Sequence, residues 1–236
     1  STLPADSGHW LTDPRGRRGL GTVPGLGSAL ESGMGADSYS GLEKLILGPF
    51  RQGLRAALWP AIWTLAKLGV PPNAVSLAQL PLGVGIVLLI EPAPRAASAL
   101  FVFTLLVDGI DGALARHTGK ASDYGALVDQ VSDHVREITV VAGLAFVGGL
   151  NDGLAALYGI AYPLLNFLLY LGASRGVRAP LALKTWLTFY PFLFLFLWTG
   201  TNWLDYAAIA SVTAMGLVSG WVLWQLSHRF EVSARE

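Results

Sequence analysis

Two pairs of aspartates at helical spacing offer the clearest chemistry in this sequence. Asp108 and Asp111 are three residues apart, and Asp129 and Asp133 are four apart, within or beside long apolar runs. On a helix, each spacing places both carboxylates on one face, about one turn apart. Four converging carboxylates in a low-dielectric place repel one another, and hard divalent cations with oxygen ligands neutralise them best. The aspartates therefore predict a metal site between two helices.

Small residues accompany the aspartates, and a polar turn, HTGKASDY, joins the two expected helices. Glycine and alanine let helices approach closely and leave room for a ligand to reach the carboxylates. The small residues are Gly109, Gly112, Ala113, Ala115 and Gly125. Because intramembrane carboxylates are rare and usually functional, we interpret residues 108–133 as the centre of the chain's chemistry. The alternative is a set of polar residues that line a transporter bundle.

The spacing of these residues forms a specific motif. From Asp108 to Asp133 the chain reads D-x-x-D-G-x-x-A-R, then eight residues, then G-x-x-x-D-x-x-x-D. This pattern resembles the signature of the CDP-alcohol phosphotransferase family, with every fixed position filled. The resemblance implies an enzyme that transfers the phosphatidyl group of a CDP-linked lipid, usually CDP-diacylglycerol, to the hydroxyl of a small alcohol and releases CMP. Ether-linked lipids would use the same motif.

The resemblance also implies a role for each aspartate. Asp108, Asp111 and Asp129 would be ligands of two Mg²⁺ or Mn²⁺ ions, both of which match all-oxygen ligation. Asp133 would be the general base for the acceptor hydroxyl and also a metal ligand. The chemistry is consistent with this assignment, because two metal ions position a diphosphate and neutralise the charge that develops on the leaving phosphate.

The resemblance further implies where the CDP group binds. Gly112, Ala115 and Gly125 would make room for the cytidine and its phosphates. Arg116 would contact the diphosphate or anchor the helix end at the cytoplasmic surface.

A second candidate contact region precedes the first apolar segment. The sequence PPNAVS resembles a segment that the family often has at this place. Asn73 and Ser76 would contact the nucleotide or its phosphates. The alternative for Asn73 is a helix N-cap, a position that asparagine favours.

Basic residues suggest the class of acceptor. Arg175, Arg178 and Lys184 cluster in one connection, and Arg136 lies three residues past Asp133, on about the same helix face. Such a cluster suits an acceptor that carries phosphate, with glycerol 3-phosphate first and inositol phosphate second. If the cluster only sets membrane topology, serine is the alternative acceptor. Arg136 needs a partner inside the membrane, and the motif carboxylates or a substrate phosphate would supply it.

Composition predicts an all-α integral membrane protein. The chain is 53% hydrophobic and 14% charged, with a mean hydropathy of +0.50, which is too apolar for an ordinary soluble domain. The net charge is zero, so no attraction to nucleic acid is implied, and the absence of cysteine excludes disulfides and thiolate metal sites. Six apolar segments are long enough to span a membrane: residues 74–91, 96–117, 124–149, 153–174, 183–200 and 204–228.

The chain divides into four parts. We expect a flexible tail over residues 1–40, an interfacial amphipathic helix over 41–70, a six-helix membrane domain over 71–230 and a C-terminal tail over 231–236. Trp59 and Trp63 are typical of the membrane interface. Most Lys and Arg residues outside the spans fall on one side of this layout, so the positive-inside rule makes both termini and the acidic motif cytoplasmic. The resemblance implies a homodimer.

The main rival is an intramembrane prenyltransferase, which also binds a diphosphate through aspartate-rich motifs and Mg²⁺. Such enzymes usually carry a second aspartate-rich motif far along the chain. Here the only later aspartates are Asp152 and Asp205, and both are expected on the opposite side of the membrane. A transporter would often show repeated halves, and the motif has no second copy.

Overall fold

The computed structural model describes residues 53, 57–177 and 185–233, and these residues form helices and no strands. Residues 57–67 are helical. Seven further helices follow: α3 (Pro72–Ile90), α4 (Pro94–His117), α5 (Asp123–Phe146), α6 (Asp152–Ser174), α7 (Thr185–Thr188), α8 (Tyr190–Thr199) and α9 (Leu204–Ser233). The prediction of an all-α fold is thus confirmed for the described part of the chain.

Short turns with defined chemistry separate the long helices. Gly119 and Gly148 follow α4 and α5 at φ of 66° and 71°, a left-handed conformation that glycine adopts without steric cost. The Ser122 hydroxyl then accepts a hydrogen bond from the backbone N–H of Gly125 and caps α5. Because the connections are this short, neighbouring helices run in opposite directions.

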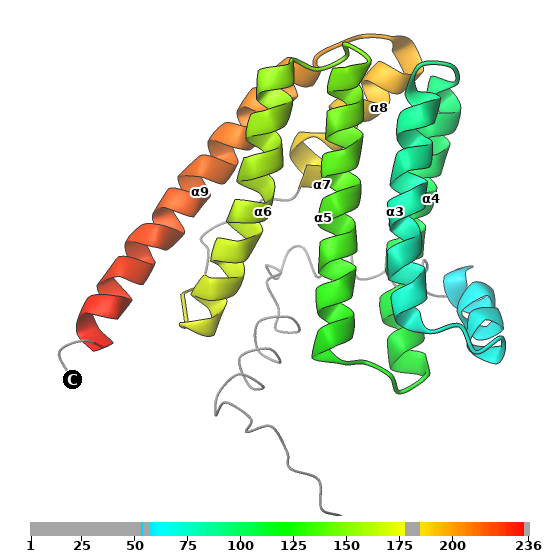
Figure 1. Cartoon of the computed structure of the whole chain (residues 1–236), viewed down its shortest axis with the longest axis horizontal. Helices are drawn as coiled ribbons and strands as arrows, with labels where there is room; N and C mark the ends of the chain where they lie inside the picture. The colour runs from blue at the N-terminus through cyan, green and yellow to red at the C-terminus, as the bar shows by residue number, and fades with distance from the viewer. Residues whose placement is uncertain (1–52, 54–56, 178–184, 234–236) are drawn as a thin grey trace, which may run out of the picture.

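Helices α3 to α6 alternate in direction along the bundle, and α9 runs in the same direction as α6 (Figure 1). The starts of α3 and α5 and the ends of α4, α6 and α9 therefore lie at one end of the molecule. Helix α3 packs against both α4 and α5, and α6 packs against α9. The approach of α3 to α5 depends on Gly143, where an added Cβ would stand 2.4 Å from Cγ2 of Val87. This close approach brings α3 next to the helices that carry the motif.

Two apolar clusters hold the bundle together. The larger includes Phe101, Tyr158 and Phe189 and joins α3, α4, α5, α6, α8 and α9. The smaller consists of Ile62, Val75, Val107, Ile110 and Leu114. It fixes the helix over 57–67 against α3 and α4, directly beside the first aspartate pair in sequence.

Four of the helices are long and apolar enough to cross a membrane: α3, α4, α6 and α9. Helix α5 is as long as α4, but it carries four charged residues between Asp129 and Glu137. The fifth predicted segment, 183–200, contains two short helices that part at Phe189. The 10 residues of α8 extend only about 15 Å, half of the roughly 30 Å hydrocarbon core. The apolar helices make this an integral membrane protein, but six spans are not confirmed.

The other predicted segments are covered only in part. Within the expected interfacial helix over 41–70, residues 57–67 are helical, and Trp59 and Trp63 have exposed side chains. The remaining residues of that helix up to residue 56, apart from Gly53, and the expected tail over 1–40 lie outside the described residues. Helix α9 continues to Ser233, so the expected C-terminal tail over 231–236 begins in helix.

Candidate active site

Three of the four motif aspartates converge between α4 and α5. One carboxylate oxygen each of Asp108, Asp129 and Asp133 lies within 4.8 Å of the others. Helix α4 supplies Asp108, and the next helix in the chain supplies the other two. All three side chains are half-buried. The structure therefore brings one aspartate of the first pair together with both aspartates of the second pair.

The fourth aspartate is held by α3. Asp111 is almost fully buried, and its Oδ2 accepts a hydrogen bond of 2.6 Å from the Ser76 hydroxyl. It is not part of the close group of three carboxylates. Ser76, predicted as a nucleotide or phosphate contact, thus contacts the acidic motif itself.

Helix α3 presents a polar face to the site. Gln79 is fully buried, and its Nε2 donates a long hydrogen bond of 3.5 Å to Oδ1 of Asp108. Its Oε1 accepts a hydrogen bond from Nη1 of Arg136 on α5. The same Arg136 Nη1 lies 3.0 Å from Oδ1 of Asp133. Gln79 and Arg136 therefore connect the aspartates of α4 to those of α5.

Gln79 is a site residue that the sequence motif does not include. The available signal was an amide inside an apolar segment, three residues after Ser76 and four before Gly83. These spacings put all three residues on one face of a helix. A polar residue within a membrane segment is a functional candidate by default, so this face could have been noticed from the sequence.

The predicted nucleotide contacts gather around the starts of α3 and α5. A Cβ added to Gly125 would stand 3.3 Å from Oδ1 of Asn73, so these residues face one another. Asn73 is not an N-cap, because α3 begins at Pro72, whose fixed φ suits the first helical position, and its cap residue is Pro71. A Cβ on Gly112 would lie 3.4 Å from Nη1 of Arg116, whose side chain is exposed. Ala115 is half-buried on the same helix.

The predicted acceptor contacts fall in different places. Arg136 is buried near the middle of α5, where Asp133 and Gln79 hold its guanidinium. Its expected orientation toward the Asp133 side of the helix is confirmed by this ion pair. Arg175 directly follows α6, exposed, at the same end of the bundle as the starts of α3 and α5 (Figure 1). Arg178 and Lys184 lie outside the described residues.

Glu137 forms a second buried polar centre next to Arg136. Its two carboxylate oxygens accept hydrogen bonds from the hydroxyls of Tyr158, at 2.8 Å, and Tyr190, at 2.6 Å. Glu137 is 2% exposed. These bonds tie α5 to α6 and α8 and satisfy a carboxylate that would be costly to bury alone.

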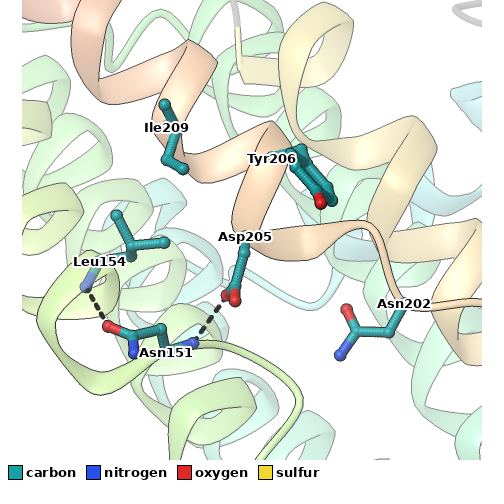
Figure 2. A pocket seen from close by; sticks show the side chains of 6 residues that line it. All are labelled: Asn151, Leu154, Asn202, Asp205, Tyr206 and Ile209. Atoms are coloured by element: carbon teal, nitrogen blue, oxygen red, sulfur yellow. Dashed lines mark hydrogen bonds between the residues drawn. The ribbon is translucent and has the colours of Figure 1, made fainter.

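A hollow of about 370 Å³, whose lining residues are drawn in Figure 2, lies near the starts of α6 and α9, at the opposite end of the bundle. Its lining includes Asn151, Asn202 and Asp205. Asp205 Oδ1 accepts a 2.8 Å hydrogen bond from the backbone N–H of Asn151, and the Asn202 amide donates to the carbonyl of Gly149 at 2.7 Å. These contacts fasten the turn before α6 to the turn before α9, so the hollow is a structural junction away from the motif.

The three converging carboxylates fit a divalent cation. Oδ1 of Asp129 is buried and has no hydrogen-bond partner among the described residues. An unpaired buried carboxylate oxygen is costly, and a hard cation with oxygen ligands would satisfy it. Carboxylates alone, without histidine or cysteine, suit Mg²⁺ or Mn²⁺.

Comparison with known proteins places the chain in a family. The model of the CDP-alcohol phosphatidyltransferase family matches residues 70–224. A 92-residue region is 34% identical to archaetidylinositol phosphate synthase of Pyrococcus horikoshii, covering 37% of this chain and 46% of that protein. A 94-residue region is 30% identical to phosphatidylinositol phosphate synthase of Mycobacterium marinum, covering 38% of this chain and 40% of that protein.

An 86-residue region is 31% identical to archaetidylinositol phosphate synthase of Aeropyrum pernix, covering 36% of this chain and 44% of that protein. The chain thus spans less than half the length of each of these curated relatives. No solved structure matches it. The family match covers α3 to α8 and most of α9, including the whole acidic motif. This chain therefore belongs to the CDP-alcohol phosphatidyltransferase family, whose members are transferases of phosphate-containing groups.

Proposed function

We propose that this protein transfers the phosphatidyl-type group of a CDP-linked lipid to the hydroxyl of a small polar alcohol in phospholipid biosynthesis. The observation that carries the proposal is the convergence of Asp108, Asp129 and Asp133 within 4.8 Å, inside the region that matches the family. The acceptor oxygen attacks the lipid-bearing phosphorus of the diphosphate. A new P–O bond forms there, the bond to the CMP phosphate breaks, and CMP leaves.

Each aspartate has a proposed role in this reaction. Asp108, Asp111 and Asp129 would hold Mg²⁺ or Mn²⁺, which when bound neutralises charge on the diphosphate. Asp133 takes the proton of the attacking hydroxyl and contributes a further ligand oxygen. The ion pair with Arg136 at 3.0 Å supports this role, because it orients the Asp133 carboxylate.

The nucleotide would lie at the starts of α3 and α5. Gly112, Ala115 and Gly125 would leave space for the cytidine and its phosphates. The face-to-face placement of Asn73 and Gly125 supports this part of the proposal. The exposed Arg116 would contact the diphosphate. Ser76 would act by holding Asp111, because its hydroxyl is already bonded there.

We propose inositol phosphate as the acceptor. The relatives are named archaetidylinositol phosphate synthase and phosphatidylinositol phosphate synthase, which favours this acceptor over glycerol 3-phosphate and serine. Arg175, with Arg178 and Lys184 after it in sequence, would bind the acceptor phosphate through charge-assisted hydrogen bonds. The burial of Arg136 favours a role inside the site rather than at the acceptor entrance.

The proposal includes a cytoplasmic site, with both chain termini on the same side, and a homodimeric assembly in the membrane. The prenyltransferase alternative finds no support in the site. Asp152 and Asp205 stand at the starts of α6 and α9, at the end of the bundle away from the motif (Figure 1). They therefore offer no second aspartate group facing the first.

The test is CMP release by the purified protein in detergent with Mg²⁺. CDP-diacylglycerol and a CDP-activated ether lipid are each paired with inositol 1-phosphate, inositol, glycerol 3-phosphate or serine. We expect CMP with inositol 1-phosphate and at most background with the others. An Asp152→Asn variant, which alters an exposed acid at the far end, serves as a matched control and should retain activity. CMP formation with a different acceptor would overturn the acceptor assignment, and no CMP with any pair would overturn the proposed activity.

A further inference from the structure

A row of three residues on α3 contacts both halves of the acidic motif. Ser76, Gln79 and Gly83 are spaced by three and four residues and share one face of the helix. Ser76 bonds to Asp111, and Gln79 bonds to Asp108 and Arg136. At Gly83, an added Cβ would stand 3.3 Å from Cγ of Arg136. The helix therefore leaves space for the arginine stem and supplies polar partners on either side of it.

Gln79 connects the two helices because its amide has two different ends. The Nε2 group donates toward Asp108 on α4, and Oε1 accepts from Arg136 on α5. A leucine or methionine could fill the same buried volume and make neither bond. A glutamate could accept from the arginine, but it could not donate to Asp108. The amide is thus suited to bridging a carboxylate and a guanidinium.

Arg136 completes the connection. Its Nη1 reaches Gln79 and, at 3.0 Å, Oδ1 of Asp133. The planar guanidinium is rigid compared with a lysine ammonium, so fixing it on Gln79 also fixes where Asp133 can lie. A continuous series of contacts runs from Asp108 through Gln79 and Arg136 to Asp133. The two end members belong to the group of converging carboxylates.

We propose that Gln79 and Arg136 are positioning residues that set the separation of the Asp108 and Asp133 carboxylates for one divalent cation. This inference rests on the proposed function, because it concerns the same metal site. It assigns Arg136 to the arrangement of the aspartates and not to the acceptor. Partners of metal ligands orient those ligands, and their loss typically weakens metal binding by about tenfold to a hundredfold.

The sign of the change in cation affinity distinguishes two roles for Arg136: positioning the Asp133 carboxylate, or only balancing its charge. If Arg136 only competed with the cation for Asp133, Arg136→Met would tighten cation binding by removing a positive charge. A positioning role predicts weaker binding, because Asp133 loses its support. Gln79→Leu changes no net charge, so an effect on cation affinity would report the loss of the amide contacts that hold Asp108 and Arg136. The two substitutions should also be non-additive, because each breaks the same series of contacts.

The experiment measures Mn²⁺ binding to the purified full chain by electron paramagnetic resonance, with Mg²⁺ and Ca²⁺ as competitors. We expect Gln79→Leu to weaken Mn²⁺ binding about tenfold or more. We expect Arg136→Met to weaken it as well, and the double variant to lose little beyond the larger single effect. Selectivity for Mg²⁺ over the larger Ca²⁺ should also fall in Gln79→Leu, because cavity geometry decides between these ions.

The matched control is Asn166→Leu, which removes a partly buried amide from α6 that donates a hydrogen bond to the Tyr162 carbonyl of its own helix. It should leave Mn²⁺ affinity unchanged. Gln79→Met is a second variant of similar size for use if Gln79→Leu does not fold, as judged by thermal unfolding in detergent. Folded Gln79 variants with wild-type affinity and selectivity would overturn the inference, as would tighter binding in Arg136→Met. Failure of the wild-type protein to bind Mn²⁺ would instead overturn the metal site on which the proposed function depends.

Discussion

The two ends of the bundle both carry aspartates and use them in opposite ways. At the junction before α6 and α9, Asp205 accepts a hydrogen bond from the Asn151 backbone (Figure 2). At the motif, three carboxylates approach within 4.8 Å, and Oδ1 of Asp129 has no partner among the described residues. A carboxylate that bonds to the backbone stabilises a turn. Converging carboxylates that lack enough donors need a ligand.

Breaking the catalytic end should have the largest effect. We expect Asp133→Asn to lower kcat by about a hundredfold to ten-thousandfold, the usual contribution of a general base. Binding of the CDP-lipid at saturating metal should be largely kept, because the other three aspartates remain and the asparagine has nearly the same shape. Single-turnover CMP release and CDP-lipid binding measure the two effects separately. Near-normal turnover would show that Asp133 is not the base.

The helix approach that assembles the motif should be the next most sensitive feature. An added side chain at Gly143 would meet Val87 at 2.4 Å, so Gly143→Leu must push α3 away from α5. We expect a loss of about 1–3 kcal/mol in the free energy of unfolding, with weaker Mn²⁺ binding because Gln79 moves with α3. Gly220→Leu on α9, where the glycine has open space, is the matched control. Equal stability of the two variants would contradict the close approach.

Arg175 should affect only the acceptor. We expect Arg175→Ala to raise the KM for inositol 1-phosphate about tenfold, because a hydrogen bond to a charged group contributes about 1.5–3 kcal/mol. The apparent affinity for the CDP-lipid should stay constant. Arg95→Ala removes an arginine near the start of α4, at the opposite end of the bundle, and should leave both values unchanged. An unchanged KM in Arg175→Ala would contradict acceptor binding by Arg175 and would favour a role in setting membrane topology.

The junction should show the smallest effect on activity. Asp205→Ala removes the hydrogen bond to Asn151 and should cost about 1 kcal/mol in the free energy of unfolding. Metal affinity and turnover per folded molecule should remain at wild-type values. Thermal unfolding and CMP release measured on the same preparation test both parts. A strong loss of turnover without a loss of stability would contradict the contrast between the two ends.

Local signals in the sequence were sufficient for most helix positions and for the convergence of the aspartates. The first predicted segment, 74–91, corresponds to α3 (Pro72–Ile90). The helix begins two residues earlier than predicted, because proline fits the first turn of a helix. The third, 124–149, ends earlier at Phe146, because Gly148 adopts a left-handed conformation. Spacing of three to four residues predicted that each aspartate pair shares a face, and the geometry agrees for the three that converge.

Features that depend on contacts between distant segments were not predictable in the same way. Most of the segment 183–200 is apolar, so its hydropathy predicts one continuous helix. Hydropathy does not show that the helix is interrupted at Phe189. Likewise, Gln79 is one amide in an apolar run, and its bonds reach helices that begin far along the chain. Such a network depends on how close α3 lies to α5, which a periodicity pattern does not contain.

The most direct test of the central claim measures CMP release from a CDP-lipid and inositol 1-phosphate as a function of added Mg²⁺, in wild type and Asp129→Asn. We predict no CMP after chelation, recovery with Mg²⁺ in wild type, and little recovery in Asp129→Asn even at high Mg²⁺. CMP release that persists at an equal rate after chelation, or that is unchanged in Asp129→Asn, would contradict a cation-dependent transfer at these carboxylates.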